Sequence, residues 1–273
     1  MNYLDLFSGI GGFHKGLLQA GFHFNWCGYS EIDKYAKQIY QKHFPESEGL
    51  GDVRTIKVDR LPKINLITFG FPCQDLSIAG KRGGITASRS GLFFEAMQII
   101  RATRPRYFIF ENVKGLFSSN EGRDWLAVLR EVADSGYDGQ WQLLNTRCFG
   151  LPHNRERVYF VGHNRGMRQP QIFPIKQEDG RHVNEDGVQV SRRGVLRPIF
   201  TLSMPTESRR AILHNRRLRH FTEIEYARLQ GFPDDWFNGF SWGVAHKCSG
   251  NSVTVPIIES IGRKLLKDND VAS

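Results

Sequence analysis

Short apolar runs alternate with amphipathic segments over residues 1–163, and this alternation limits the fold more than any other feature of the sequence. We expect strands at the apolar runs 2–7, 24–30, 64–69, 107–110 and 158–161. We expect helices at 13–20, 34–43 and 92–103. Strands that alternate with helices in this way pair mainly in parallel, and helices then cover both faces of the sheet. The predicted fold class is therefore α/β.

The pattern changes after residue 162. Residues 163–218 contain many arginines and several prolines but no sustained periodicity, which predicts a small, loop-rich or short-stranded insertion. Helical signals return at Thr222 and Glu225, which have the spacing of a capping box, and Gly231 suits the end of that helix. We expect residues 1–162 to form a large domain, 163–218 a small basic region, and 219–273 a return to the large domain with a C-terminal helix on it.

The charge is concentrated in one region. Of the net charge of +9, residues 163–220 contribute a surplus of seven, from twelve basic residues, eleven of them arginine, and five acidic ones. This clustering favours a polyanion as partner over a merely solvated basic face. No apolar run is long enough to cross a bilayer, and the N-terminus has no basic leader before an apolar stretch, so we expect a soluble protein of the cytoplasm.

Candidate binding residues lie where the predicted strands end, because ligands of open parallel sheets bind there. A glycine-rich turn at 7–12 follows the first strand, although His14 occupies the position of the third glycine in a dinucleotide fingerprint. Glu31 and Asp52 follow two later strands. Each acid alone is more often a helix cap or a loop residue, but together with the turn they indicate a nucleoside pocket without a pyrophosphate site. S-adenosylmethionine fits this description best.

A second group of candidates shares the same rim. Cys73 follows the third strand and Glu111 the fourth, while Arg155 and Arg157 directly precede another strand. A thiol with an ordinary pKa of about 8.5 is only slightly ionised at neutral pH, so a catalytic cysteine needs nearby positive charge, which the arginines can supply. Packing of the cysteine and surface exposure of the arginines are the alternatives. The cysteines are far apart and form no metal-ligand pattern, so we expect no metal.

Taken in order, nine segments resemble the motifs of the C5-cytosine DNA methyltransferases. They are DLFSGIGGF at 5–13, SEIDKYA at 30–36, GDV at 51–53, GFPCQDLSIAG at 70–80, RSGLFFE at 89–95, ENVKG at 111–115, NRERVYFVG at 154–162, RLQGFPDDW at 228–236 and GNSV at 250–253. The gap at 163–218 is where that family keeps its variable target-recognition region. The resemblance implies a Rossmann-like sheet and a DNA (cytosine-5)-methyltransferase that converts S-adenosylmethionine to S-adenosylhomocysteine.

The resemblance also implies catalytic roles. Cys73 would attack C6 of a flipped-out cytosine and make C5 nucleophilic toward the methyl group. Glu111 would hold the ring at N3 and at the exocyclic amine, and Arg155 and Arg157 would line the base pocket. The family usually has a glutamine two residues before the first of these arginines, where this chain has His153. A histidine can still donate one hydrogen bond, so we expect an active enzyme.

For the cofactor, the resemblance implies that Phe7 lies against the adenine, Glu31 holds the ribose and Asp52 binds the adenine amine. The predicted cofactor-binding residues are Phe7, Gly9, Ile10, Gly11, Gly12, Glu31, Ile32, Asp52, Val53, Gly70, Pro72, Leu92, Asn251 and Ser252.

Double-stranded DNA is the expected partner. Segment 80–91 has four glycines and three basic residues, which suits a hinged loop that approaches phosphates. Thr201-Leu202 is similar to a threonine-leucine pair in the family's recognition regions. The predicted DNA-binding residues are Lys81, Arg82, Arg89, Arg192, Arg193, Arg197, Thr201, Leu202, Arg209 and Arg210. We expect a monomer, with a cognate restriction endonuclease as a candidate partner.

Three alternatives stay open. The branch of the family that methylates transfer RNA shares the thiol and the cofactor pocket, although the basic insertion favours duplex DNA. A catalytically silent DNA-binding relative would not need Cys73 beside a methyl donor. A nicotinamide-dependent dehydrogenase is disfavoured by His14.

Overall fold

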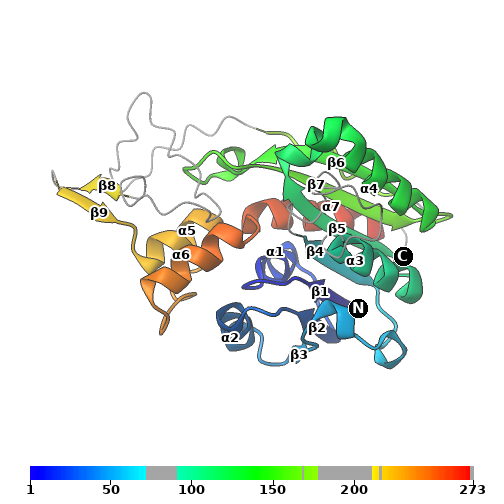
Figure 1. Cartoon of the computed structure of the whole chain (residues 1–273), viewed down its shortest axis with the longest axis horizontal. Coiled ribbons are helices and arrows are strands. Elements are labelled where there is room, and N and C mark those ends of the chain that lie inside the picture. The colour runs from blue at the N-terminus through cyan, green and yellow to red at the C-terminus, as the bar shows by residue number, and fades with distance from the viewer. Residues whose placement is uncertain (72–90, 168, 178–210, 215–216, 271–273) are drawn as a thin grey trace.

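The computed structural model describes residues 1–71, 91–167, 169–177, 211–214 and 217–270. Within these residues a seven-stranded sheet has the order β3-β2-β1-β4-β5-β7-β6 (Figure 1). Its strands are β1 (Asn2–Leu6), β2 (Trp26–Ser30), β3 (Glu48–Gly49), β4 (Leu66–Gly70), β5 (Tyr107–Val113), β6 (Tyr137–Asn145) and β7 (Glu156–Asn164). Strands β1 to β5 pair in parallel, and β7 is antiparallel to both of its neighbours. The predicted α/β class and mainly parallel sheet are confirmed.

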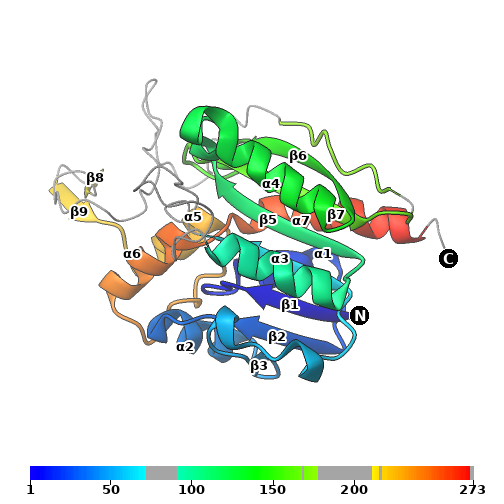
Figure 2. The same cartoon turned by 45° about the vertical axis from the view of Figure 1, so that its right-hand side comes forward.

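Helices cover both faces of the sheet (Figure 2). On one face α3 (Gly91–Thr103) and α4 (Arg123–Asp134) pack over β4, β5 and β7 in one hydrophobic cluster. On the other face α1 (Gly12–Ala20) packs beside the last helix, α7 (Val255–Asp270). Because both faces are covered, central strands such as β4 are buried along nearly their whole length and read as continuous apolar runs. This is why the sequence revealed them.

Local signals set the ends of several helices. Asp33 caps α2 (Lys34–His43) by accepting hydrogen bonds from the Tyr35 and Ala36 amides. Thr222 and Glu225 form the predicted capping box of α5 (Glu223–Gln230), and Gly231 ends that helix in the left-handed conformation. Helix α6 (Trp242–Asn251) packs against α5 and α2 in a third hydrophobic cluster.

Strand β6 was not predicted, because it is an edge strand that carries polar residues and a glycine at 138–140 and has no continuous apolar run. Two of its glutamines bind the backbone of residues 169–177 instead of solvent. Gln142 Nε2 donates to the Ile175 carbonyl at 3.0 Å, and Gln142 Oε1 accepts from the Ile175 amide at 2.8 Å. Ile172, Phe173 and Ile175 are buried against the sheet. The first part of the range 163–218 therefore packs on the large sheet.

Near the end of the range 163–218, a separate hairpin is formed by β8 (Ala211–His214) and β9 (Arg217–His220). The hairpin extends away from the sheet and leads into α5 (Figure 1). Short 3-10 turns connect other elements, among them η1 (Val53–Thr55), η4 (Lys114–Phe117) and η6 (Thr146–Phe149). Among the described residues, no helix has the length and apolar character that crossing a membrane requires.

Candidate active site

The reversal of β7 brings the candidate catalytic residues to one edge of the sheet. Strands β4 and β5 end at this edge, whereas β7 begins there. In the register of the sheet, Gly70 is opposite Glu111, and Val113 is opposite Arg157. Residues from the end of one strand and the start of another therefore meet, as the sequence predicted for the carboxyl ends of the strands.

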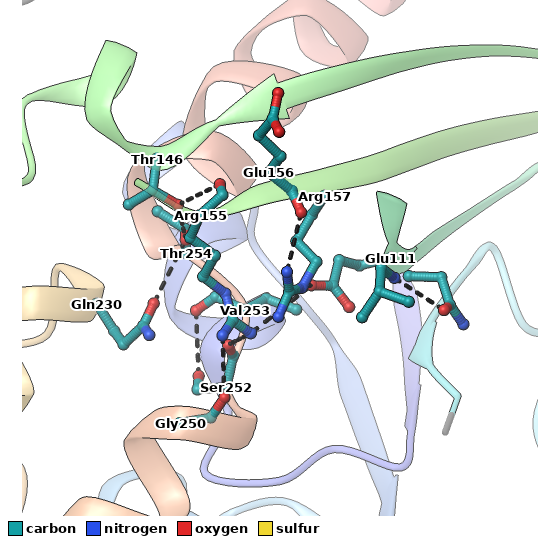
Figure 3. A network of polar contacts seen from close by, with 12 residues as sticks. Glu111, Thr146, Arg155, Glu156, Arg157, Gln230, Gly250, Ser252, Val253 and Thr254 are labelled. Carbon is teal, nitrogen blue, oxygen red and sulfur yellow. Dashed lines mark hydrogen bonds and ion pairs between the residues drawn. The ribbon is translucent and has the colours of Figure 1, made fainter. Parts of the chain in front are cut away.

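Glu111 lies beside two arginines at this edge (Figure 3). Arg157 Nε is 3.0 Å from Glu111 Oε1, and Arg155 Nη2 is 3.8 Å from the same oxygen. The side chains of all three are largely buried, so their charges are weakly screened by solvent. Although Oε1 is buried, it accepts no well-aligned hydrogen bond from the described residues. The carboxylate is thus held by the charges of the two arginines and not by a well-aligned hydrogen bond among the described residues.

Arg155 has a different set of partners from Arg157. Its Nη1 donates to the Gly250 carbonyl at 3.0 Å, and its Nη2 donates to the Ser252 carbonyl at 2.8 Å. Burial, with a contribution from Arg157, lowers the pKa of Arg155 to about 10, so it remains positively charged at neutral pH. Arg155 therefore joins the base of β7 to the segment between α6 and α7, while Arg157 is the closer ion-pair partner of Glu111.

The glycine-rich turn after β1 is joined to the turn after β2 by Glu31. Its carboxylate accepts hydrogen bonds from the backbone amides of Gly9 at 2.9 Å, Ile32 at 2.7 Å and Asp33 at 2.8 Å. A carboxylate can accept about four hydrogen bonds, so one site remains for a ligand hydroxyl. Phe7 has a φ of 52°, a left-handed conformation that an aromatic residue rarely adopts. The turn is thus held in a specific, strained shape.

The other predicted cofactor residues surround this turn. Gly12 begins α1, where an added Cβ would lie only 2.7 Å from Ser252 Oγ, so a glycine is required for this close approach. Ile10 and Val53 are buried, while Gly11 has positive φ. Three further predicted positions are placed as follows: Ile32 is exposed, Asn251 is exposed, and Leu92 is half-buried at the start of α3.

Asp52 has a partner that the sequence did not suggest. Its carboxylate accepts hydrogen bonds from Arg54 Nε at 3.0 Å and 3.2 Å, and it caps η1 through the Arg54 amide at 3.0 Å. The Arg54 side chain lowers the pKa of Asp52 by hydrogen bonding to its ionised form. An acid followed two residues later by an arginine is the local signal that could have predicted the pair.

Asn112 is a further site residue that the sequence did not single out for a role. It is buried, and its Nδ2 donates to the Phe71 carbonyl at 2.9 Å. Its Oδ1 accepts from the amide of Val113 at 2.8 Å. Asn112 therefore ties the end of β5 to the last described residue before Pro72 and Cys73.

His153 contacts the backbone of α5. Its Nε2 lies 2.6 Å from the Leu229 carbonyl, which can only accept, so Nε2 carries the proton. Burial lowers the pKa of His153 to about 4, and the ring is neutral at physiological pH. The one hydrogen bond expected of this histidine thus connects the residues before β7 to the C-terminal part of the chain.

Several predicted site residues lie outside the described part of the chain. They are Pro72, Cys73, Lys81, Arg82, Arg89, Arg192, Arg193, Arg197, Thr201, Leu202, Arg209 and Arg210. Of the described cysteines, Cys27 and Cys248 are unsuited to nucleophilic chemistry, because burial raises their pKa values to about 11 and about 12. Within the described residues, no three His, Cys, Asp or Glu side chains gather in a way that could hold a metal.

The fold and this edge define an α/β protein with a glycine-rich turn held by Glu31 and a buried carboxylate paired with two arginines. Comparison with known proteins gives the family. The profile of the C-5 cytosine-specific DNA methylases matches residues 1–193 and 176–267. The chain is 34% identical to the type II methyltransferase M.NgoBI of Neisseria gonorrhoeae, over 94% of the chain and 90% of that protein. It is 32% identical to the type II methyltransferase M.HpaII of Haemophilus parainfluenzae, over 97% of the chain and 89% of that protein.

Solved structures show the same fold at lower identity. The methyltransferase EhMeth of Entamoeba histolytica superposes with a TM-score of 0.72 at 18% identity, over 98% of each chain. A putative DNA modification methyltransferase encoded within an Escherichia coli prophage gives a TM-score of 0.71 at 22% identity, over 99% of each chain. The chain belongs to the C-5 cytosine-specific DNA methylase family. The predicted family, the Rossmann-like fold class and the enzyme class are confirmed.

Proposed function

We propose that the protein transfers a methyl group from S-adenosylmethionine to C5 of a flipped-out cytosine in duplex DNA, through a covalent bond to Cys73. The observation that carries this proposal is the buried Glu111 carboxylate, whose Oε1 lies 3.0 Å from Arg157 Nε and 3.8 Å from Arg155 Nη2. It stands at the edge of the sheet where β4 leads toward Cys73. A carboxylate in this position can hold an amine-bearing ring beside a nucleophile.

The chemistry assigned to Cys73 balances without a further oxidant or reductant. The thiolate forms a bond from Sγ to C6, and the electron pair of the C5–C6 double bond moves to C5. After C5 has gained the methyl group, it loses its proton to a base, the double bond re-forms and the bond from Sγ to C6 breaks. Bound S-adenosylmethionine supplies the methyl group as an electrophile on a positively charged sulfur.

Glu111 would stabilise the cytosine during the attack. Its carboxyl group would donate a proton to N3 and accept a hydrogen bond from the exocyclic amine, so that the ring gains positive charge and accepts electrons from the thiolate more readily. The two arginines fix the orientation of Glu111, since Arg157 pairs with it and Arg155 is anchored to two backbone carbonyls. We assign to Arg157 a second role, the supply of positive charge beside the thiolate.

The described cofactor residues fit S-adenosylmethionine. Glu31 has an acceptor left for the ribose hydroxyls after binding three amides. The exposed Ile32 offers an apolar surface for an adenine. The strained Phe7 directly follows β1 and begins the glycine-rich turn that Glu31 holds. Asp52 can accept from the adenine amine while it stays paired with Arg54. Asn251 and Ser252 would close the pocket from the C-terminal side.

DNA recognition is assigned to the range 163–218 and to segment 80–91. Bases in a stack shield C5 and C6, so the target must leave the duplex before Cys73 can reach it, at a cost of a few kcal/mol. Arginine suits both guanine readout and phosphate contact, and this range holds most of the positive charge. We further propose that the enzyme acts as a monomer in the cytoplasm, and that a restriction endonuclease of the same specificity is its partner.

Transfer of tritium from labelled S-adenosylmethionine tests the function. The assay compares duplex DNA with transfer RNA for wild type, Cys73→Ala and Cys27→Ala. We expect DNA labelling by wild type and by Cys27→Ala, whose thiol has a raised pKa, and none by Cys73→Ala. Labelling of transfer RNA alone would assign the protein to the RNA branch, and labelling by Cys73→Ala would exclude the proposed nucleophile.

A further inference from the structure

Two buried threonines join distant parts of the chain beside the candidate active site. Thr146 begins η6 and Thr254 directly precedes α7, so they are far apart in sequence. Both are fully buried, and their hydroxyl oxygens lie 2.8 Å apart (Figure 3). A hydroxyl pair without access to water persists only where each group finds a partner, because an unpaired buried hydroxyl is costly.

Further polar contacts join Thr146 to Arg155 and Thr254 to α5. The Thr146 amide donates to the Arg155 carbonyl at 3.0 Å, and Thr146 Oγ1 donates to the same oxygen at 3.3 Å. Thr254 Oγ1 lies 3.4 Å from Oε1 of Gln230, the last residue of α5. A chain of polar contacts thus runs from α5 through both hydroxyls to the backbone of Arg155.

The direction of the hydroxyl protons matters for Arg155. Each hydroxyl donates once, so two protons cannot serve all three contacts of the chain. The Thr254 proton has two acceptors in reach, Gln230 Oε1 at 3.4 Å and Thr146 Oγ1 at 2.8 Å, and the shorter contact is the stronger. With Thr254 donating to Thr146, the Thr146 proton is free to bind the Arg155 carbonyl, and each bond polarises the next. The Thr254 hydroxyl therefore strengthens the contact that holds the backbone of Arg155.

Arg155 is held both at its guanidinium group and at its backbone carbonyl. Its guanidinium binds the carbonyls of Gly250 and Ser252, and its carbonyl is held by Thr146, which Thr254 supports. The same guanidinium stands 3.8 Å from Glu111 Oε1. A shift of Arg155, which directly precedes β7, would therefore change the position of positive charge near Glu111.

We propose that Thr146 and Thr254 are positioning residues, which hold Arg155 beside Glu111 and thereby raise the rate of methyl transfer; this inference rests on the proposed function. Neither residue contacts the reacting atoms. Both act through Arg155, so their loss should slow the chemical step more than it weakens the binding of cofactor.

Valine at position 254 removes the hydroxyl and keeps the shape, while serine keeps the hydroxyl. Thr103→Val is the matched control, because among the described residues its hydroxyl donates to the Ile99 carbonyl, at the end of α3 away from Glu111. For Thr254→Val we expect kcat to fall by about 3- to 10-fold, the rate equivalent of one hydrogen bond, with an unchanged Kd for S-adenosylmethionine. The kcat values of Thr254→Ser and Thr103→Val should stay within about twofold of wild type. Serine keeps the hydroxyl and its hydrogen bond, and Thr103 lies away from Glu111.

A wild-type kcat in Thr254→Val, or an equal loss in Thr254→Ser, would overturn the positioning role. Thermal unfolding supplies a readout that does not need activity. The Tm decreases of Thr146→Val and Thr254→Val should add up to more than the decrease of the double variant, because the two hydroxyls share one bond. Additive Tm decreases would show that the two hydroxyls are not coupled and would refute the proposed hydrogen bond between them. A wild type that transfers no methyl group to DNA, with non-additive Tm decreases, would instead count against the proposed function alone.

Discussion

His14 makes the stability of the protein depend on pH in a way that can be worked out from its surroundings. The ring is buried in α1, stacked on Phe44 with centroids 3.9 Å apart, and its Nδ1 lies 2.9 Å from the Tyr40 hydroxyl. Burial lowers the pKa of His14 from 6.5 to about 4. The folded protein therefore resists protonation of a group that the unfolded chain protonates readily.

The sign follows from proton binding. Above pH 6.5 both states hold a neutral ring, and His14 adds no pH dependence. Between pH 6.5 and pH 4 only the unfolded state binds the proton, so stability falls as the pH falls. The full loss is about 3 kcal/mol, and about 2 kcal/mol of it should be present at pH 5.

Substitution of His14 by glutamine removes the titrating group and keeps a hydrogen-bonding side chain. Urea unfolding followed by circular dichroism at pH 7.5 and pH 5 gives the stability of both proteins. With a slope of about 2–3 kcal/mol per molar urea, the wild-type midpoint should fall by about 0.7–1 M more than that of His14→Gln. Other titrating groups are common to both proteins and cancel in this difference. Equal midpoint decreases would refute the proposed origin of the acid sensitivity.

Three further predictions concern the site. Glu111→Gln should lower kcat by about 100- to 1000-fold with little change in the calorimetric Kd for S-adenosylmethionine, because it removes charge stabilisation at the base and leaves the cofactor pocket alone. A target 2-aminopurine should brighten when the enzyme binds, since flipping unstacks it, and constant fluorescence would argue against flipping. A base-reading arginine changed to alanine should cost about 1–3 kcal/mol and relax one target position, whereas a phosphate-binding one should weaken all sites alike. Bisulfite sequencing is the measurement for the alanine variants of Arg192, Arg193, Arg197, Arg209 and Arg210; an unchanged sequence preference and affinity in all five would place recognition elsewhere.

The sequence predicted those parts of the fold that have local causes. The interior strands follow from apolar runs, and α2 has the predicted bounds because Asp33 caps its first turn. The capping box of α5 was visible for the same reason. Strand β6 was missed because one of its edges is covered by residues 169–177, whose backbone is held by glutamine side chains of the strand. The local sequence of β6 carries no signal for this long-range contact.

The candidate site shows the same division. Motif resemblance named Glu111, Arg155 and Arg157, but it could not distinguish the two arginines. Their difference arises from contacts with carbonyls more than ninety residues away, for which the local sequence carries no signal. His14 was read only as a missing glycine, whereas in the fold it fills the space between α1 and α2.

Covalent trapping tests the central claim most directly. A duplex with 5-fluorocytosine at the target has no removable proton at C5, so the adduct cannot resolve after methylation. With S-adenosylmethionine present, wild type should stay attached to this DNA through denaturing electrophoresis, and Cys73→Ala should not. Release of wild type under conditions in which it methylates ordinary DNA, or attachment of Cys73→Ala, would contradict the assignment of Cys73 as the nucleophile.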